Sequence, residues 1–249
     1  MRPFPQNSGI SASPPTGLGD LPFAPGQLLE KLPHSRADTP LKLIAVSQSV
    51  VAVREPGGAT RRQDVIDQSW AALLEACDCL ALPVPNQPQS ATRLLDEAPI
   101  DGVLLTCGNE LTVNGGDAPE RDRTEFALVT HAIHNNLPVL GVGRGMQIIQ
   151  RLFSVPLKKV DDHVSSTLEI KINGRDEIVN SDHRYGAMAT VPELKIWARA
   201  QDGVVKAIEN KKHNLTGIMW RPDRMHPFAE SDIELIRKTF DTNRGAARL

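Results

Sequence analysis

Apolar residues between positions 41 and 240 follow two patterns that alternate along the chain. Short apolar runs have the length of buried strands, and they lie at residues 43–46, 80–82, 102–105 and 138–142. The segments between and after these runs are interpreted as helices, at residues 64–77, 92–97, 120–132, 145–153 and 229–240. Strands that alternate with helices in this way predict a parallel sheet covered by helices on both faces.

The region from residue 164 to residue 218 has a different pattern. It is richer in strands and turns, and its predicted strands lie at residues 168–170, 196–198, 204–205 and 215–220. We therefore expect a smaller antiparallel addition to the parallel sheet.

The two ends of the chain differ in composition from the segment between them. Residues 1–40 hold eight of the 19 prolines, and proline removes a backbone donor and fixes φ, so we expect a disordered or extended N-terminal segment. Residues 243–249 form a short basic tail. A single α/β domain is therefore predicted for residues 41–242.

Charge and cysteine content argue against several classes of function. The net charge of −2 gives no basic surface for nucleic acid, and no apolar stretch approaches the roughly 20 residues that span a bilayer. Three cysteines without a repeated spacing argue against a disulfide framework and a structural zinc site. We expect a cytoplasmic protein that binds neither nucleic acid nor membrane and needs no cofactor.

Residues 140–147 combine a strand end, a sharp turn and a helix start. This is the layout of a nucleophile elbow, in which the turn residue holds a strained backbone conformation at a helix N-terminus. The turn residue here is Gly143. Glycine adopts a positive φ without steric cost, but it offers no side chain for nucleophilic attack. The sequence therefore predicts an elbow without a nucleophile.

Five ordered sequence blocks resemble those of class I glutamine amidotransferases, especially of the gamma-glutamyl hydrolase branch. They are GVLLTCGNEL at 102–111, RDRTE at 121–125, PVLGVGRGMQII at 138–149, VNSDH at 179–183 and GIMWRPD at 217–223. The segments DQSWAALLEACDCLALPVP and RPDRMHPFAESDIELI are similar to the gamma-glutamyl-CDP-amidate hydrolase-like branch. The resemblance covers about residues 42–240, and it implies a three-layer α/β sandwich with the flavodoxin-like fold of this family.

The departures from the family pattern concern its catalytic triad. The resemblance places the family's nucleophilic cysteine at Gly143, its histidine at Arg221 and its glutamate at Asp223. A guanidinium stays protonated at physiological pH, so Arg221 cannot act as the base that a cysteine nucleophile needs. Cysteine-dependent glutaminase activity is therefore predicted to be absent.

The residues that remain around the elbow favour the binding of an anion. Backbone N–H groups at a helix N-terminus and the guanidinium of Arg221 both suit a carboxylate or a phosphate. The predicted ligand-binding residues are Gly108, Asn109, Gly143, Arg144, Gln147 and Arg221. The alternative is that Arg221 and Asp223 form an internal ion pair that fills a dead site.

Three side chains are candidates for residual catalysis. Asp223 retains a carboxylate, His183 can act as a general acid or base, and Cys107 can act as a displaced nucleophile with His183 as its base. The alternatives are a tolerated small residue at Cys107 and a backbone-bonded loop histidine at His183. His163 follows two aspartates, but no second ligand cluster has metal-binding spacing, so we expect a solvated loop and no metal site.

Two functions of different classes remain open. The first is a repurposed enzyme that acts by acid–base chemistry on a small anionic or amide-bearing metabolite of a biosynthetic route. The second is a catalytically dead pseudo-glutaminase that binds a ligand, regulates, or partners a synthetase. The pocket blocks outside the triad still match the family, which favours the first function.

Overall fold

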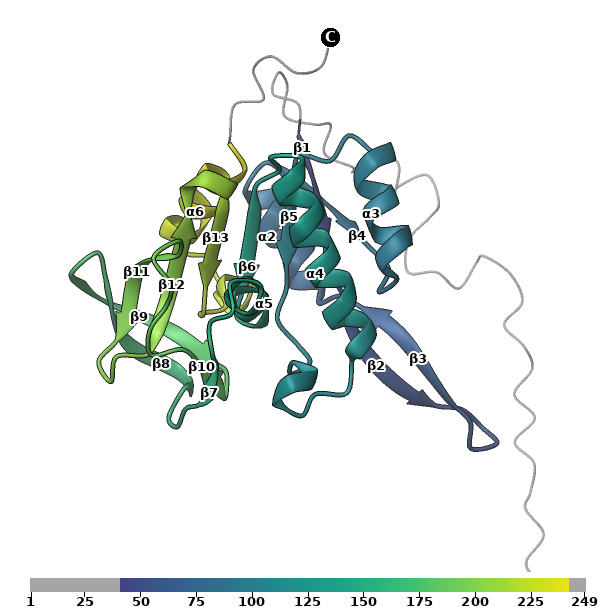
Figure 1. The fold of residues 1–249 in the computed structure, drawn as a ribbon, viewed down its shortest axis with the longest axis horizontal. Coiled ribbons are helices and arrows are strands. Elements are labelled where there is room, and N and C mark those ends of the chain that lie inside the picture. The colour runs from purple at the N-terminus through teal and green to yellow at the C-terminus, as the bar shows by residue number, and fades with distance from the viewer. Residues whose placement is uncertain (1–40, 242–249) are drawn as a thin grey trace, which may run out of the picture. The chain divides into compact units, whose positions relative to one another are not determined.

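The computed structural model describes residues 41–241, which form a nine-stranded sheet with helices packed against it (Figure 1). The strand order is β4-β1-β5-β6-β13-β12-β11-β8-β9. The predictions for residues 1–40 and for the tail at 243–249 lie outside the described residues. Within the described part of the chain, no helix is long and apolar enough to cross a membrane.

One half of the sheet is parallel. Its strands are β4 (Cys79–Pro83), β1 (Lys42–Val46), β5 (Gly102–Leu105), β6 (Val139–Val142) and β13 (Leu215–Ile218). Every residue of β5 and β6 is buried. Strands covered on both faces are apolar at each position, which is why uninterrupted apolar runs predicted them.

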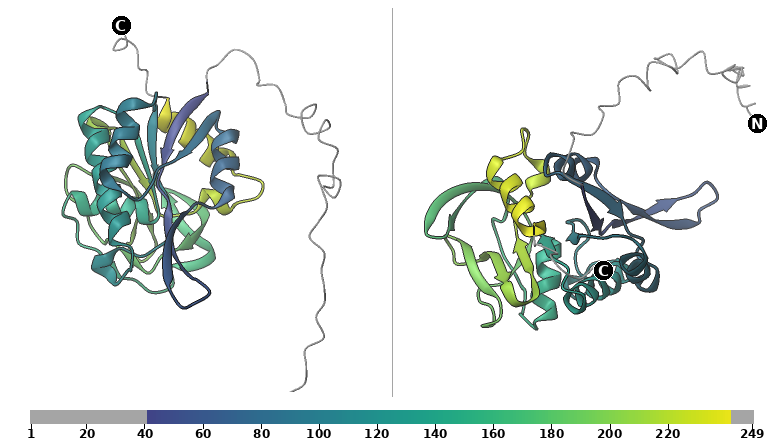
Figure 2. Two further views of the ribbon diagram at one scale, coloured as in Figure 1. Left: turned by 90° about the vertical axis from the view of Figure 1, so that its right-hand side faces the viewer. Right: turned by 90° about the horizontal axis from the view of Figure 1, so that it is seen from above.

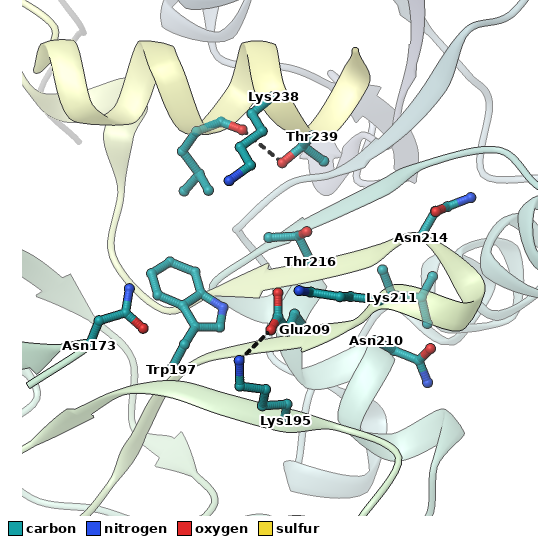
Figure 3. Close-up of a pocket in the computed structure, with 12 residues that line it drawn as sticks. Asn173, Lys195, Trp197, Glu209, Asn210, Lys211, Asn214, Thr216, Lys238 and Thr239 are labelled. Carbon is teal, nitrogen blue, oxygen red and sulfur yellow. Dashed lines mark hydrogen bonds and ion pairs between the residues drawn. The ribbon is translucent and has the colours of Figure 1, made fainter. Parts of the chain in front are cut away.

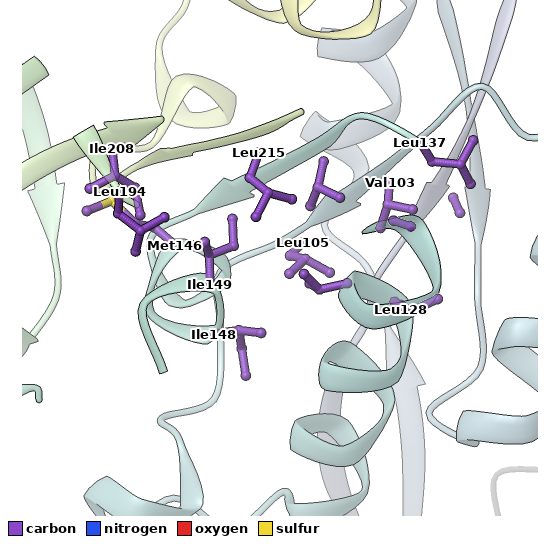
Figure 4. Close-up of a cluster of buried hydrophobic side chains, with 14 of the residues drawn as sticks. Val103, Leu105, Leu128, Leu137, Met146, Ile148, Ile149, Leu194, Ile208 and Leu215 are labelled. Carbon is purple, nitrogen blue, oxygen red and sulfur yellow. The ribbon is translucent and has the colours of Figure 1, made fainter. Parts of the chain in front are cut away.

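Helices cover both faces of the parallel strands. Their bounds are α2 (Gln68–Ala76), α3 (Pro88–Glu97), α4 (Pro119–His134), α5 (Arg144–Leu152) and α6 (Glu230–Phe240). One core cluster joins α3, α4 and α5 to the sheet, with Leu128 and Ile149 among its members (Figure 4). The other cluster joins α2 and α6 to the sheet through residues such as Leu73 and Phe240. The predicted three-layer α/β fold is confirmed.

The other half of the sheet is antiparallel. Its strands are β12 (Val205–Asn210), β11 (Lys195–Ala200), β8 (Val164–Ile172) and β9 (Arg175–Asp182), and a two-stranded sheet is formed by β7 (Lys158–Lys159) and β10 (Tyr185–Gly186). The predicted antiparallel addition therefore continues the main sheet. Asn180 and Ser181 of the VNSDH block lie on β9, a strand that was not predicted, because this largely exposed strand has no apolar run that would mark it.

An antiparallel hairpin of β2 (Ser49–Arg54) and β3 (Thr60–Val65) extends away from the sheet (Figures 1 and 2). The prediction placed the start of a helix within β3, and this was wrong. Helix α2 begins later because the side chain of Asp67 accepts a hydrogen bond from the Ser69 backbone N–H at 3.0 Å, which caps the first turn. Most side chains of the hairpin are exposed, so hydrophobic periodicity could not reveal it.

Helix α5 packs closely against the parallel strands because Gly145 has no side chain. A Cβ at this position would lie 2.6 Å from the Cβ of Leu105 and closer still to the Leu105 carbonyl oxygen. On β6, a Cβ at Gly141 would lie 2.6 Å from the Gly145 carbonyl carbon. These contacts determine where the N-terminus of α5 meets the sheet.

A substitution tests this close approach. Replacing glycine by alanine inside a helix normally stabilises it by about 1 kcal/mol. For Gly145→Ala we expect instead a loss of about 1–3 kcal/mol in the free energy of unfolding, because the methyl group collides with β5. Urea denaturation measures the change, with Gln89→Ala on the exposed side of α3 as the control. A Gly145→Ala variant as stable as the natural chain would contradict the close contact.

Candidate functional site

The turn between β6 and α5 lies at the carboxyl end of the parallel strands. Gly143 has a φ of +54° and a ψ of −109° there, a conformation that is strained for any residue with a side chain. Its N–H donates to the carbonyl of Ile218 at 2.7 Å, and its carbonyl accepts from the Gln147 N–H at 3.2 Å. The turn therefore has the backbone form of a nucleophile elbow, with glycine at its apex.

The side chain of Cys107 occupies the space beside Gly143. A Cβ built on Gly143 would lie 2.6 Å from the Cys107 Sγ. The Cys107 thiol donates to the carbonyl of Val142 at 3.2 Å, and the Arg144 backbone N–H is directed at the sulfur. Burial raises the pKa of Cys107 to about 12, so the group is a neutral thiol at physiological pH.

Arg221 and Asp223 form a two-point ion pair next to this thiol. The Arg221 Nε donates to Asp223 Oδ1 at 2.8 Å and its Nη2 donates to Asp223 Oδ2 at 2.5 Å. The carboxylate raises the pKa of Arg221 above its ordinary value. The Asn180 side chain accepts a hydrogen bond from the Arg221 backbone N–H at 2.7 Å and donates one to the Arg221 carbonyl at 2.8 Å. The ion pair that the sequence left as an alternative is thus present.

A cavity of about 310 Å³ opens at this end of the sheet. Its lining residues are Ser49, Val65, Ile66, Asp67, Trp70, Thr106, Cys107, Gly108, Arg221 and Arg224. The cavity carries charges of both signs, because Asp67 lines it together with the two arginines. Asp182 lies beside them, 2.9 Å from Arg224 Nη1 and 3.8 Å from Arg221 Nη1.

Sequence reasoning missed four polar residues of this cavity: Ser49, Asp67, Thr106 and Arg224. Ser49 begins the hairpin, which was not predicted, and Asp67 lies within the predicted helix at residues 64–77 but caps the N-terminus of α2. Arg224 follows the GIMWRPD block directly and lies within the segment RPDRMHPFAESDIELI, and both positions were available signals.

The side chain of Arg144 points away from the cavity. It forms ion pairs with Asp122 and Glu125 on α4, and Glu125 also accepts from Arg121 Nε at 2.9 Å. Arg144 and Glu125 are both buried. The role of Arg144 in ligand binding remains a prediction; the contacts observed join α4 to α5.

Asn109 and Gln147 also lie outside the lining of the cavity. Asn109 accepts from the Val50 N–H at 2.9 Å and donates to the Val50 carbonyl at 2.8 Å, which fastens the base of the hairpin. Gln147 donates to the Tyr185 carbonyl at 2.8 Å. Both remain predicted ligand contacts, whereas Gly108, Cys107 and Arg221 line the cavity.

His183 lies in a buried polar cluster and does not line the cavity. Its Nδ1 is 3.0 Å from the Tyr185 carbonyl, which can only accept, so Nδ1 carries the proton. Its Nε2 then accepts from Lys206 Nζ at 2.7 Å. Burial and the Lys206 ammonium lower the pKa of His183 to about 3, and burial lowers the pKa of Lys206 to about 7.

The predicted solvated position of His163 was wrong. Its ring is buried, stacks on the His183 ring at a centroid distance of 4.9 Å, and places Nε2 2.9 Å from Asp202 Oδ2. The error arose because the neighbouring aspartates are exposed, while the histidine faces the interior from the same turn. Between residues 41 and 241, no group of three or more histidine, cysteine, aspartate or glutamate side chains is arranged to hold a metal ion.

The chain matches the family model of peptidase C26 over residues 42–157 and 153–223. It is 25% identical to the gamma-glutamyl-CDP-amidate hydrolase of Campylobacter jejuni, over 57% of this chain and 70% of that protein. It is 26% identical to protein NtpR of Enterococcus hirae, over 66% of this chain and 84% of that protein.

A solved structure shares the fold. It is a Thermoplasma acidophilum protein assigned to GMP synthase as one of its subunits, with a TM-score of 0.61 and 14% identity. The alignment covers 80% of this chain and 92% of the other. At this level of identity the likeness concerns the fold alone.

A double-mutant cycle tests whether Cys107 fills the space at the elbow. We expect Gly143→Ala to lower the free energy of unfolding by about 1–3 kcal/mol, through backbone strain and collision with the sulfur. Cys107→Ala should relieve the collision, so the two changes should be non-additive by about 1 kcal/mol. Urea denaturation gives these values. The same cycle with Cys77→Ala, a buried thiol at the C-terminal end of α2, should be additive. Additivity with Cys107→Ala would contradict the contact.

The buried Lys206 should make stability depend on pH. Its folded pKa of about 7 is below its unfolded value near 10.4, so above pH 7 the unfolded chain binds more protons and stability rises with pH. Relative to Lys206→Met, the natural chain should gain about 1–2 kcal/mol between about pH 7 and pH 8.5. Denaturation at each pH measures this, with exposed Lys212→Met as the control. Parallel curves for the natural chain and Lys206→Met would rule out the depressed pKa.

Proposed function

The chain belongs to the peptidase C26 family, and we propose that it is a non-hydrolysing member that binds a small carboxylate-bearing metabolite beside Gly143. The observation that carries this proposal is the position of the Cys107 sulfur, 2.6 Å from where a side chain at Gly143 would begin. The triad that the family resemblance implies then has no nucleophile at the elbow. The Arg144 backbone N–H also interacts with this sulfur.

The geometry favours ligand binding over a repurposed enzyme. An acid–base reaction needs a group near the substrate whose pKa lies close to the working pH. His183 is buried outside the cavity with a pKa of about 3, and Cys107 is a neutral thiol. Asp223 is fully buried against Arg221. None of the three predicted catalytic side chains is therefore poised for proton transfer in this cavity.

The charged side chains that line this cavity indicate which ligand it would bind. Arg224 is half exposed, and Asp223 does not bind the Nη1 of Arg221. Asp182 pairs with both arginines, at 2.9 and 3.8 Å, and the guanidinium N–H groups that these carboxylates leave free can donate to a ligand carboxylate. Asp67 on the same wall can accept from an ammonium group. A γ-glutamyl group ends in one ammonium and one carboxylate, and one relative is named as a hydrolase of a gamma-glutamyl compound. We therefore infer a ligand of the γ-glutamyl or amino-acid type.

The partners and the cellular location of the protein are part of this proposal. They are a small anionic metabolite as the partner, a synthetase or other biosynthetic protein that responds to the bound ligand, and a cytoplasmic location. Of the two functions considered, the catalytically dead pseudo-glutaminase fits an elbow at which Cys107 fills the space beside Gly143. In this form the protein binds its ligand and regulates a synthetase or another biosynthetic protein.

Calorimetric titration with glutamate, glutamine and a γ-glutamyl dipeptide tests the proposal. We expect binding of at least one of them, weakened about tenfold or more by Arg224→Ala because a charge-assisted hydrogen bond is lost. Arg175→Ala, an exposed arginine on β9, should leave the affinity unchanged.

Hydrolysis is measured in the same samples by release of ammonia or of free glutamate. No release above that of buffer is expected. Turnover that Cys107→Ser abolishes would overturn the non-hydrolysing assignment, and the absence of binding for every probe would overturn the assignment of the ligand.

A further inference from the structure

A second cavity, of about 480 Å³, lies at the other end of the parallel strands. Leu215 lies on its wall and pairs with Val139 at the start of β6, whereas Gly143 follows the end of β6. The two cavities share no lining residue. Residues that line the second one are Asn173, Lys195, Trp197, Glu209, Lys211 and Lys238, among others (Figure 3).

Three lysines from three separate elements converge on this cavity. Lys195 belongs to β11 and pairs with Glu209 at 2.9 Å. Lys211 opens a 3-10 turn after β12, and Lys238 lies in the last turn of α6. Within residues 41–241, neither Lys211 nor Lys238 has an ion pair. Among the described residues, the cavity therefore carries two positive charges, on Lys211 and Lys238, that pair with no carboxylate.

Trp197 gives the same cavity an apolar wall. Its indole is half-buried on β11 and meets the Trp220 ring edge-on, at a centroid distance of 5.7 Å. Thr216 adds a hydroxyl to the lining. An aromatic wall next to unpaired ammonium groups is the combination that holds a planar ring and a phosphate together.

We propose that this cavity is a second ligand site, which binds a phosphorylated metabolite with a planar ring, the class that nucleoside diphosphates represent. Its volume lies within the range of about 300–1,000 Å³ that is usual for small-molecule sites. Lys211 and Lys238 would bind the phosphates, and Trp197 would cover the ring. The site does not rest on the function proposed for the elbow, since it uses none of those residues.

Calorimetric titration with ADP, pyrophosphate and adenosine at low salt tests the site. The double variant Lys211→Gln/Lys238→Gln should bind ADP and pyrophosphate about tenfold more weakly or worse. Lys212→Gln is the matched control, because this neighbouring exposed lysine does not line the cavity, and it should change affinity less than about twofold. Trp197→Leu should weaken ADP but not pyrophosphate.

The same titrations also test whether ADP binds at this second site and not in the cavity beside the elbow. Arg224→Ala should leave ADP binding intact, which separates this site from the elbow cavity. Absence of ADP binding at millimolar concentration, or an equal loss with Lys212→Gln, would overturn the site. Pyrophosphate binding with no added gain for ADP would overturn the role of Trp197.

Discussion

The carboxyl end of the sheet depends on the close packing of glycines where β6 turns into α5. Gly141 and Gly145 let the helix approach the strands to a distance that no larger residue permits, and Gly143 makes the sharp turn between them. The helix N-terminus is thereby held at the edge of the sheet, where ligands bind in open α/β folds. The Cys107 sulfur occupies the space beside the turn, 2.6 Å from where a Cβ on Gly143 would lie.

Buried arginines hold the surrounding loops in place. Arg121 has no exposed surface, and it donates to the carbonyls of Thr106 and Cys107, both at 2.8 Å, and to Glu125. A buried guanidinium is tolerated only when its donors are satisfied, so these contacts leave little freedom for the segment that carries Cys107. The same logic applies to Arg221, which Asp223 holds against the cavity wall. The arginines of this site therefore act first as structural groups, and only their free edges face a ligand.

Hydrophobic periodicity was sufficient to predict the parallel half of the sheet and its helices. It was insufficient for β9 and for the hairpin of β2 and β3, because strands that are exposed on most positions leave no apolar signal. The candidate site was likewise only partly predictable from the sequence. The elbow at Gly143 and the residue Arg221 could be predicted from local motifs. Arg224 and Asp67 lie in segments that resemble the family, but nothing in those segments showed that their side chains line the same cavity as Arg221.

The sequence by itself determined the fold class and the glycine at the elbow, since both follow from residues close together in the chain. Only the tertiary structure decided what the polar residues do. His183, which follows β9, contacts Lys206 on β12. Cys107, which follows β5, contacts Gly143, which follows the neighbouring strand β6. Burial and charge pairing then set whether each group can bind or transfer a proton. These depend on residues distant in the chain, which no motif or spacing encodes.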